Sequence, residues 1–121
     1  MKYVDGYVIP VPKKNIKAYQ KMASMAGKIW IEHGALDYKE CVAEDMSAKH
    51  CPPFTKLLKT KPSETVVFSY IVFKSRAHRN KVNMKVMKDP RLAVWATKKM
   101  PFDLKKMSYG GFTTLVDMEK K

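Results

Sequence analysis

The chain has 121 residues, of which 45% are hydrophobic and 29% charged, and its formal net charge is +13. This length fits about one domain, and the composition is typical of a globular protein with a hydrophobic core. No apolar run approaches the roughly 20 residues of a membrane-spanning helix, and residues 1–12 lack the apolar core and cleavage site of a secretory signal. We therefore expect one domain over residues 1–121, located in the cytosol.

The positive charge resides almost entirely in lysines, because the only arginines are Arg76, Arg79 and Arg91. Lysine carries a strongly hydrated point charge, whereas the planar guanidinium of arginine suits phosphate recognition. The lysines are also scattered along the chain. We interpret them chiefly as a solvated surface, and lysine-driven nucleic-acid binding is the alternative.

The first predicted element is a strand over residues 3–12, in which β-favouring residues alternate and two prolines mark an edge or a strand end. A helix follows, with Asn15 as its N-cap. Apolar residues recur in it at steps of three and four, and Gly34 ends it at the C′ position. Residues 35–45 form a second strand, whose mixed polarity indicates that one side meets water.

Residues 46–63 are the least regular segment and include a short helical piece around residues 54–59. The strongest predicted strand follows at residues 64–74, "ETVVFSYIVFK". Both of its alternating sets are largely apolar, which is typical of a central strand buried on both faces.

The last part of the chain contains two predicted helices and a strand. Ser75 caps a helix that runs to about residue 88. Asp89 and Pro90 then start a short helix, with the acid as cap and proline in the first turn. Residues 108–118 form the final strand.

The order strand, helix, strand, strand, helix, strand is the split βαβ, ferredoxin-like arrangement. It predicts an α+β fold with a four-stranded antiparallel sheet and both main helices on one face. Apolar residues of the third strand also point to the other face, which an exposed sheet would leave bare. We expect a second copy of the chain to cover that face, since two-fold pairs are the commonest oligomers.

Five stretches of the chain are informative together, in this order: "YVDGYVIPVP", "EHGALDY", "ETVVFSYIVF", "KVMKDPR" and "MPFDLKKMSYGGF". They resemble the YbaA-like family of short bacterial proteins, a family catalogued as a domain of unknown function. The resemblance extends from Tyr3 to about Asp117. It implies membership of the dimeric α/β-barrel superfamily, in which two ferredoxin-like sheets face each other. That superfamily includes cofactor-free monooxygenases, isomerases, haem enzymes and ligand-binding members, so it implies no single activity.

Three residues are candidates for acid–base chemistry. His33 ends the first helix, where it is either a catalytic group near a pocket or a histidine favoured by the helix dipole. Asp5 is unusual within a strand; it faces a pocket, pairs with a lysine at an edge, or lies at a bulge permitted by Gly6. Asp103 either closes a turn or lines a pocket.

Four aromatic residues, Tyr7, Tyr70, Trp95 and Tyr109, are candidates for ligand contacts, with core packing as the alternative. The glycine pair at 110–111 marks a bulge or a close approach by another backbone or a ligand. No metal site is predicted, because the histidines and cysteines lack ligand spacing, and no cofactor is predicted.

These observations favour a homodimer that binds a small apolar or aromatic molecule between sheet and helices, with cofactor-free catalysis as an extension. The alternatives are the nucleic-acid-binding protein and a structural dimer without chemistry.

Overall fold

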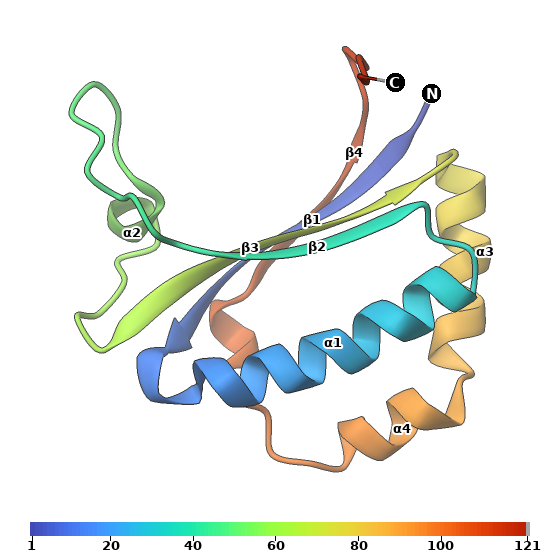
Figure 1. Cartoon of the computed structure of the whole chain (residues 1–121), viewed down its shortest axis with the longest axis horizontal. Helices are drawn as coiled ribbons and strands as arrows, with labels where there is room; N and C mark the ends of the chain where they lie inside the picture. The colour runs from blue at the N-terminus through green and yellow to red at the C-terminus, as the bar shows by residue number, and fades with distance from the viewer. Residues whose placement is uncertain (121) are drawn as a thin grey trace.

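The computed structural model describes residues 1–120, which adopt an α+β fold built on one antiparallel sheet (Figure 1). The sheet has four strands in the order β2-β3-β1-β4, so β1 and β3 are central and β2 and β4 are edges. The strands are β1 (Tyr3–Pro12), β2 (Asp37–Val42), β3 (Glu64–Phe73) and β4 (Ser108–Thr113).

Helices cover one face of this sheet. Figure 1 shows α1 and α4 below the strands and α3 descending from their right-hand end, while the loop that carries α2 and the two ends of the chain rise on the other side. Short 3-10 turns precede α1 and β4. The helices are α1 (Ile16–Glu32), α2 (Phe54–Leu57), α3 (Arg76–Met87) and α4 (Pro90–Ala96), and the 3-10 turns are η1 (Lys13–Asn15) and η2 (Leu104–Lys106).

The two central strands match their predicted ranges closely, whereas the edge strands are shorter than predicted. The predicted strand over residues 35–45 is paired only from Asp37 to Val42, because the chain then turns away towards α2. The predicted strand over residues 108–118 ends at Thr113. Thr113 lies opposite Tyr3, the first residue of β1, so the chain beyond it has no continuing strand to pair with.

Local capping chemistry explains where α3 and α4 begin and where α1 ends. The side chain of Ser75 accepts a hydrogen bond from the backbone N–H of His78, and Asp89 caps α4 in the same way. Gly34 has φ +116° and donates to the carbonyl of Ile31 at 3.1 Å, while the next N–H reaches that of Trp30 at 3.0 Å. This pair of bonds is the Schellman motif.

The prediction of Asn15 as the N-cap of α1 is confirmed for its position and wrong for its hydrogen bond. Asn15 occupies the N-cap position of α1, but its side chain makes no capping bond. Its Nδ2 instead donates to the carbonyl of Pro101 at 3.0 Å. The side chain therefore ties the start of α1 to the segment between α4 and η2, a long-range contact that replaces the local one.

The glycines on β1 and β4 do not form bulges. The β1–β4 register runs without interruption through Gly6 opposite Gly110 and Asp5 opposite Gly111. A Cβ on Gly111 would lie 2.3 Å from the hydroxyl oxygen of Tyr3. The predicted bulge is therefore wrong, and the close neighbour of Gly111 is a side chain of the same chain. An approach by another backbone or a ligand stays a prediction.

The buried core lies between the sheet and the helices in two clusters. One cluster surrounds Phe73 and Ile29, and the other surrounds Val11 and Tyr19. Both prolines of β1 lie beyond Val8, where β4 no longer pairs with this strand. A central strand thus tolerates them, since the missing N–H groups fall where the strand is paired on one side only.

Candidate functional site

One transverse row of the sheet carries polar side chains between the two core clusters. In register, Glu40 of β2 lies opposite Ser69 of β3, Ser69 opposite Tyr7 of β1, and Tyr7 opposite Tyr109 of β4. Polar groups inside a protein cost free energy unless they find hydrogen-bond partners. Hydrogen bonding, rather than apolar packing, therefore explains the residue types in this row.

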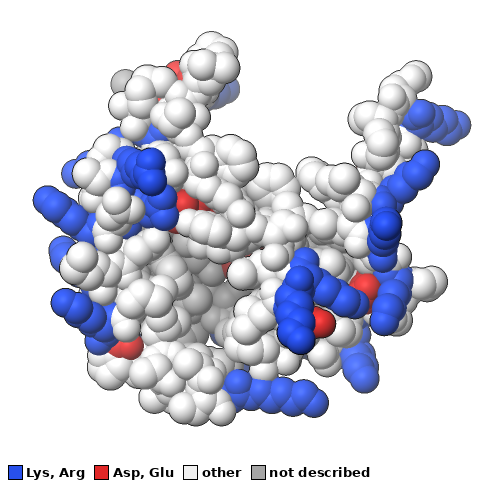
Figure 2. Space-filling view, turned by 180° about the vertical axis from the view of Figure 1, so that it is seen from behind, with Lys and Arg blue, Asp and Glu red and all other residues white. Residues whose placement is uncertain are grey.

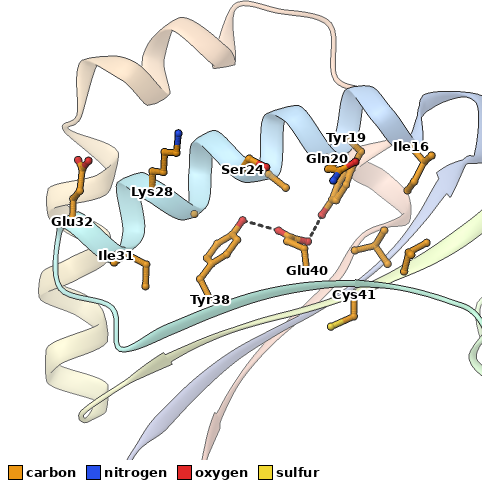
Figure 3. Close-up of a pocket in the computed structure, with 14 residues that line it drawn as sticks. Ile16, Tyr19, Gln20, Ser24, Lys28, Ile31, Glu32, Tyr38, Glu40 and Cys41 are labelled. Atoms are coloured by element: carbon orange, nitrogen blue, oxygen red, sulfur yellow. Dashed lines mark hydrogen bonds between the residues drawn. The ribbon is translucent and has the colours of Figure 1, made fainter.

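Glu40 is the centre of a hydrogen-bonded trio at one end of this row. The hydroxyl of Tyr19, from α1, donates to its Oε1 at 2.7 Å, and the hydroxyl of Tyr38 donates to its Oε2 at 2.6 Å (Figure 3). Burial raises the pKa of both tyrosines, and the nearby carboxylate raises it further. Both phenols therefore remain protonated donors at neutral pH, and Glu40 acts as the acceptor with both oxygens.

An inner cavity of about 390 Å³ lies between the sheet, α1, α4 and η2, with the trio in its wall. In the view from behind, the surface is hollowed between the helices at the bottom and the sheet (Figure 2). Glu40 is the only ionisable acid among the lining residues in the described part of the chain, and Ser69 adds a hydroxyl. The lining includes six aromatic residues, Tyr7, Tyr19, Trp30, Tyr38, Trp95 and Phe102, and four methionines, Met22, Met25, Met100 and Met107.

A second hollow of about 750 Å³ follows the groove between α1 and the edge strand β2 (Figure 3). It shares Tyr19, Tyr38 and Glu40 with the inner cavity, so the carboxylate lies at the boundary of both. The rest of the groove includes the charged side chains of Lys28 and Glu32. The inner cavity is smaller but more apolar, which is the character expected of a small-molecule site.

Asp5 is fully buried on β1 in a separate polar cluster. Its Oδ1 accepts a hydrogen bond from the Tyr109 hydroxyl at 3.1 Å and lies 3.9 Å from Nε of Arg79. Its Oδ2 has no hydrogen-bond partner among the described residues. Asp5 thus neither pairs with a lysine at an edge nor lies at a bulge, since β1 is central and in continuous register.

Asp5 does not line the inner cavity, and its connection to the cavity runs through Tyr109 and Tyr7. The rings of Tyr7 and Tyr109 lie 4.9 Å apart, and Tyr7 lines the inner cavity. Burial, together with the charge of Asp5, raises the pKa of Tyr7. Tyr7 therefore lies between the fully buried Asp5 and the half-buried Glu40 on the helix-covered face.

His33 belongs to a charged cluster that joins α1 to α4. Its Nε2 lies 2.8 Å from Oδ2 of Asp89. Arg91 contacts the same carboxylate through Nε at 3.0 Å and also donates to Glu32 at 2.6 Å. The hydrogen bonds from Arg91 and then His33 lower the pKa of Asp89. This cluster fixes the start of α4 and does not line the inner cavity.

The remaining predicted site residues lie in different places. Asp103 is exposed and accepts a hydrogen bond from the backbone N–H of Lys105, which caps η2. Tyr70 points to the outer face of the sheet, beside Phe68. Trp95 lines the inner cavity, as does Tyr7. The structure therefore brings Tyr7 and Trp95 together at one cavity and places His33, Asp5 and Asp103 outside it.

The sequence reasoning missed Glu40, Tyr19, Tyr38 and Ser69. One signal was present, because Tyr38, Glu40 and Val42 alternate and must share a face of their strand. A glutamate between an aromatic and an aliphatic residue on one face is the pattern of a carboxylate turned inward. Its partner Tyr38 lies two positions away on the same strand, whereas the contact with Tyr19 depends on how α1 crosses β2, which no local pattern indicates.

The described residues include no group of three His, Cys, Asp or Glu side chains that could hold a metal ion. Within the same residues, no helix has both the length and the apolar character needed to cross a membrane.

The sheet, its single helix-covered face and the carboxylate-bearing cavity between them define a two-layer α+β protein. A family model described as "Protein of unknown function (DUF1428)" matches residues 2–104, and the chain belongs to this family. The relative named "Uncharacterized protein YbaA" from Escherichia coli K12 is 42% identical over 117 residues, covering 97% of this chain and 99% of its own. The protein of the same name from Shigella flexneri matches equally.

Among solved structures, "De novo designed protein Foldit4" aligns over 94% of this chain and 99% of its own, with 8% identity and a TM-score of 0.47. This degree of likeness carries no argument about function.

Proposed function

We propose that the inner cavity binds a small, apolar or aromatic molecule that Glu40 orients. The observation that carries this proposal is a carboxylate held by Tyr19 and Tyr38 in the wall of an otherwise apolar cavity. Binding sites for small molecules are mostly apolar, with a few placed polar groups that fix orientation. A volume of about 390 Å³ suits a ligand of roughly one or two rings.

The proposal extends to cofactor-free proton transfer. A general base must lie within hydrogen-bond reach of the proton that it removes, and Glu40 is the carboxylate that a ligand in this cavity would meet. Asp5 would support this chemistry indirectly, through Tyr109 and Tyr7. His33 and Asp103 lie outside the cavity, so we give them no direct part in it.

We also propose that the chain is a ferredoxin-like subunit of a homodimeric α/β barrel. The sheet order β2-β3-β1-β4 supports this, as does the resemblance in sequence. On the outer face, Phe68 is 42% exposed and Phe112 is 60% exposed. Figure 2 shows a concave surface between two rising arms that is largely free of charged residues. A second copy of this sheet is the occupant that a dimeric barrel would place there.

The cytosol remains the proposed location. Cys41 and Cys51 are both exposed and free, as expected in a reducing compartment. Nucleic-acid binding ranks second as a function, because on the face in Figure 2 the basic residues are spread around the rim and do not gather in one strip.

The test is ligand binding by variants that do or do not fill the cavity. Ala93 and Ala96 of α4 are both exposed, but only Ala96 lines the inner cavity. A panel of small aromatic compounds is titrated in thermal unfolding, where a ligand at 100 times its Kd stabilises the native state by about 2.7 kcal/mol. We expect Ala96→Trp to abolish the stabilisation and Ala93→Trp to retain it.

Two outcomes would overturn the binding proposal. Either no compound of the panel stabilises the wild-type chain, or Ala96→Trp and Ala93→Trp respond alike. The second outcome would place any binding outside the cavity.

A further inference from the structure

The inner cavity contains one acidic and no basic side chain among the described residues, although the protein as a whole is strongly basic. The chain has 24 lysines and arginines against 11 acids, yet Glu40 forms no salt bridge with any described residue. No lysine, arginine or histidine lines the cavity within the described part of the chain. The carboxylate is therefore held by neutral phenols alone, without a counter-ion.

The absence of a basic side chain among the described lining residues argues against anionic ligands. An anion in the cavity would lie close to Glu40 with no cation to compensate either charge, and unpaired charges are costly in apolar surroundings. A positively charged group would instead complete an ion pair. Each oxygen of a carboxylate accepts more than one hydrogen bond, so the bonds from Tyr19 and Tyr38 leave capacity for a further donor.

The rest of the lining also suits a cation with an apolar body. Aromatic faces attract ammonium groups through their ring quadrupole, and six aromatic side chains surround the cavity. Four methionines add soft, adaptable contacts for a hydrocarbon part. An aromatic enclosure with one carboxylate combines both interactions that favour an amine.

We propose that the inner cavity selects organic cations, specifically apolar amines of about one ring, with the ammonium group on Glu40. This inference rests on the proposed small-molecule function and adds the charge class of the ligand. Selection by Glu40 would oppose the field of the whole protein, because a net charge of +13 attracts anions in general. A preference for the cation would therefore be due to Glu40 and the cavity around it, and not to the net charge of the protein.

The experiment compares three probes of similar size and different charge. The full chain is titrated calorimetrically at pH 7 with 2-phenylethylamine, 2-phenylethanol and 3-phenylpropionate. We expect the amine to bind most tightly and the carboxylate most weakly. We expect Glu40→Gln, which keeps the size and an acceptor oxygen, to weaken amine binding about 10- to 100-fold and to leave the alcohol nearly unchanged.

The matched control is Glu44→Gln, because Glu44 is exposed and lies outside the cavity. It removes the same charge from the chain and should leave the affinity for all three probes unchanged. If Glu40→Gln does not fold, the order of the three probes on the wild-type chain decides the question.

Failure of this inference differs from failure of the proposed function. Binding of the alcohol or the carboxylate as tightly as the amine would overturn the selection for cations and leave small-molecule binding intact. Equal weakening of amine binding by Glu44→Gln would assign the effect to general surface charge and overturn the role of Glu40. Absence of binding by all three probes would overturn the inference, and the wider panel would still test the proposed function.

Discussion

Each face of the sheet carries side chains that depart from the usual pattern of an antiparallel sheet. The helix-covered face contains the buried Asp5 and Ser69 and the half-buried Glu40, whereas the outer face exposes Phe68 and Phe112. An ordinary antiparallel sheet buries its apolar side and exposes its polar side. The comparison teaches that carboxylates can occupy the covered face where tyrosine hydroxyls donate hydrogen bonds to them, as they do to Asp5 and Glu40. The exposed aromatic side chains of the outer face are the observation behind the proposed dimer.

The largest expected effect comes from the packed part of the covered face. Phe73 is fully buried at the end of β3, and Phe73→Ala should lower the free energy of unfolding by about 3–5 kcal/mol. Urea unfolding measures this loss. Met84→Ala on α3, where the methionine is 59% exposed, should stay within about 0.5 kcal/mol of the wild type. Similar losses for both variants would mean that this face is not packed as described.

The next effect concerns the outer face. Phe68 contacts the rings of Phe54 and Tyr70 at the centre of this surface. Phe68→Glu should raise the dissociation constant of the proposed dimer about 100-fold or more, because a two-fold interface contains the changed residue twice. Sedimentation equilibrium at micromolar concentrations measures the change. Met84→Glu is the control, and a wild-type chain that sediments as a monomer would refute the dimer.

A smaller effect is expected at the buried polar cluster. Asp5→Ala would leave the Tyr109 hydroxyl and the Arg79 guanidinium without their carboxylate. The expected loss is about 1–3 kcal/mol of unfolding free energy. Asp5→Asn keeps an acceptor for Tyr109 and should cost less. A double-mutant cycle with Tyr109→Phe measures the coupling, and strictly additive losses would contradict the contact.

The smallest effect is a pH dependence at the junction of α1 and α4. Arg91 and His33 lower the pKa of Asp89 in the folded chain, so the carboxylate stabilises the fold above its unfolded pKa of about 3.9. This contribution is lost as the pH falls through the lower folded value. Asp89→Asn should therefore flatten the decline of the melting temperature in acid.

Arg91→Gln provides the second variant for this junction, since it removes the first partner of Asp89 and should flatten the same part of the curve. Glu32 also contacts Arg91, and its pKa is lowered as well. Melting curves between pH 2 and 6 measure both variants. An acid limb identical to that of the wild type would show that the junction does not contribute.

The sequence by itself determined the central strands, the main helices and several helix ends. These features depend on local signals: alternation in β3, the three- and four-residue period of α1, and the caps at Ser75, Asp89 and Gly34. Local signals act between residues a few positions apart, so the printed sequence contains all the information that they need.

Only the tertiary structure decided which polar residues meet. Tyr19 and Glu40 are 21 positions apart, and His33 and Asp89 are 56 apart. Their contacts depend on the register of the strands and on where α1 crosses the sheet. The same packing placed His33 and Asp103 away from the cavity and brought Glu40 to it. Side chains from distant segments meet only after the whole chain has packed, and for that reason the candidate site follows from the fold rather than from any motif.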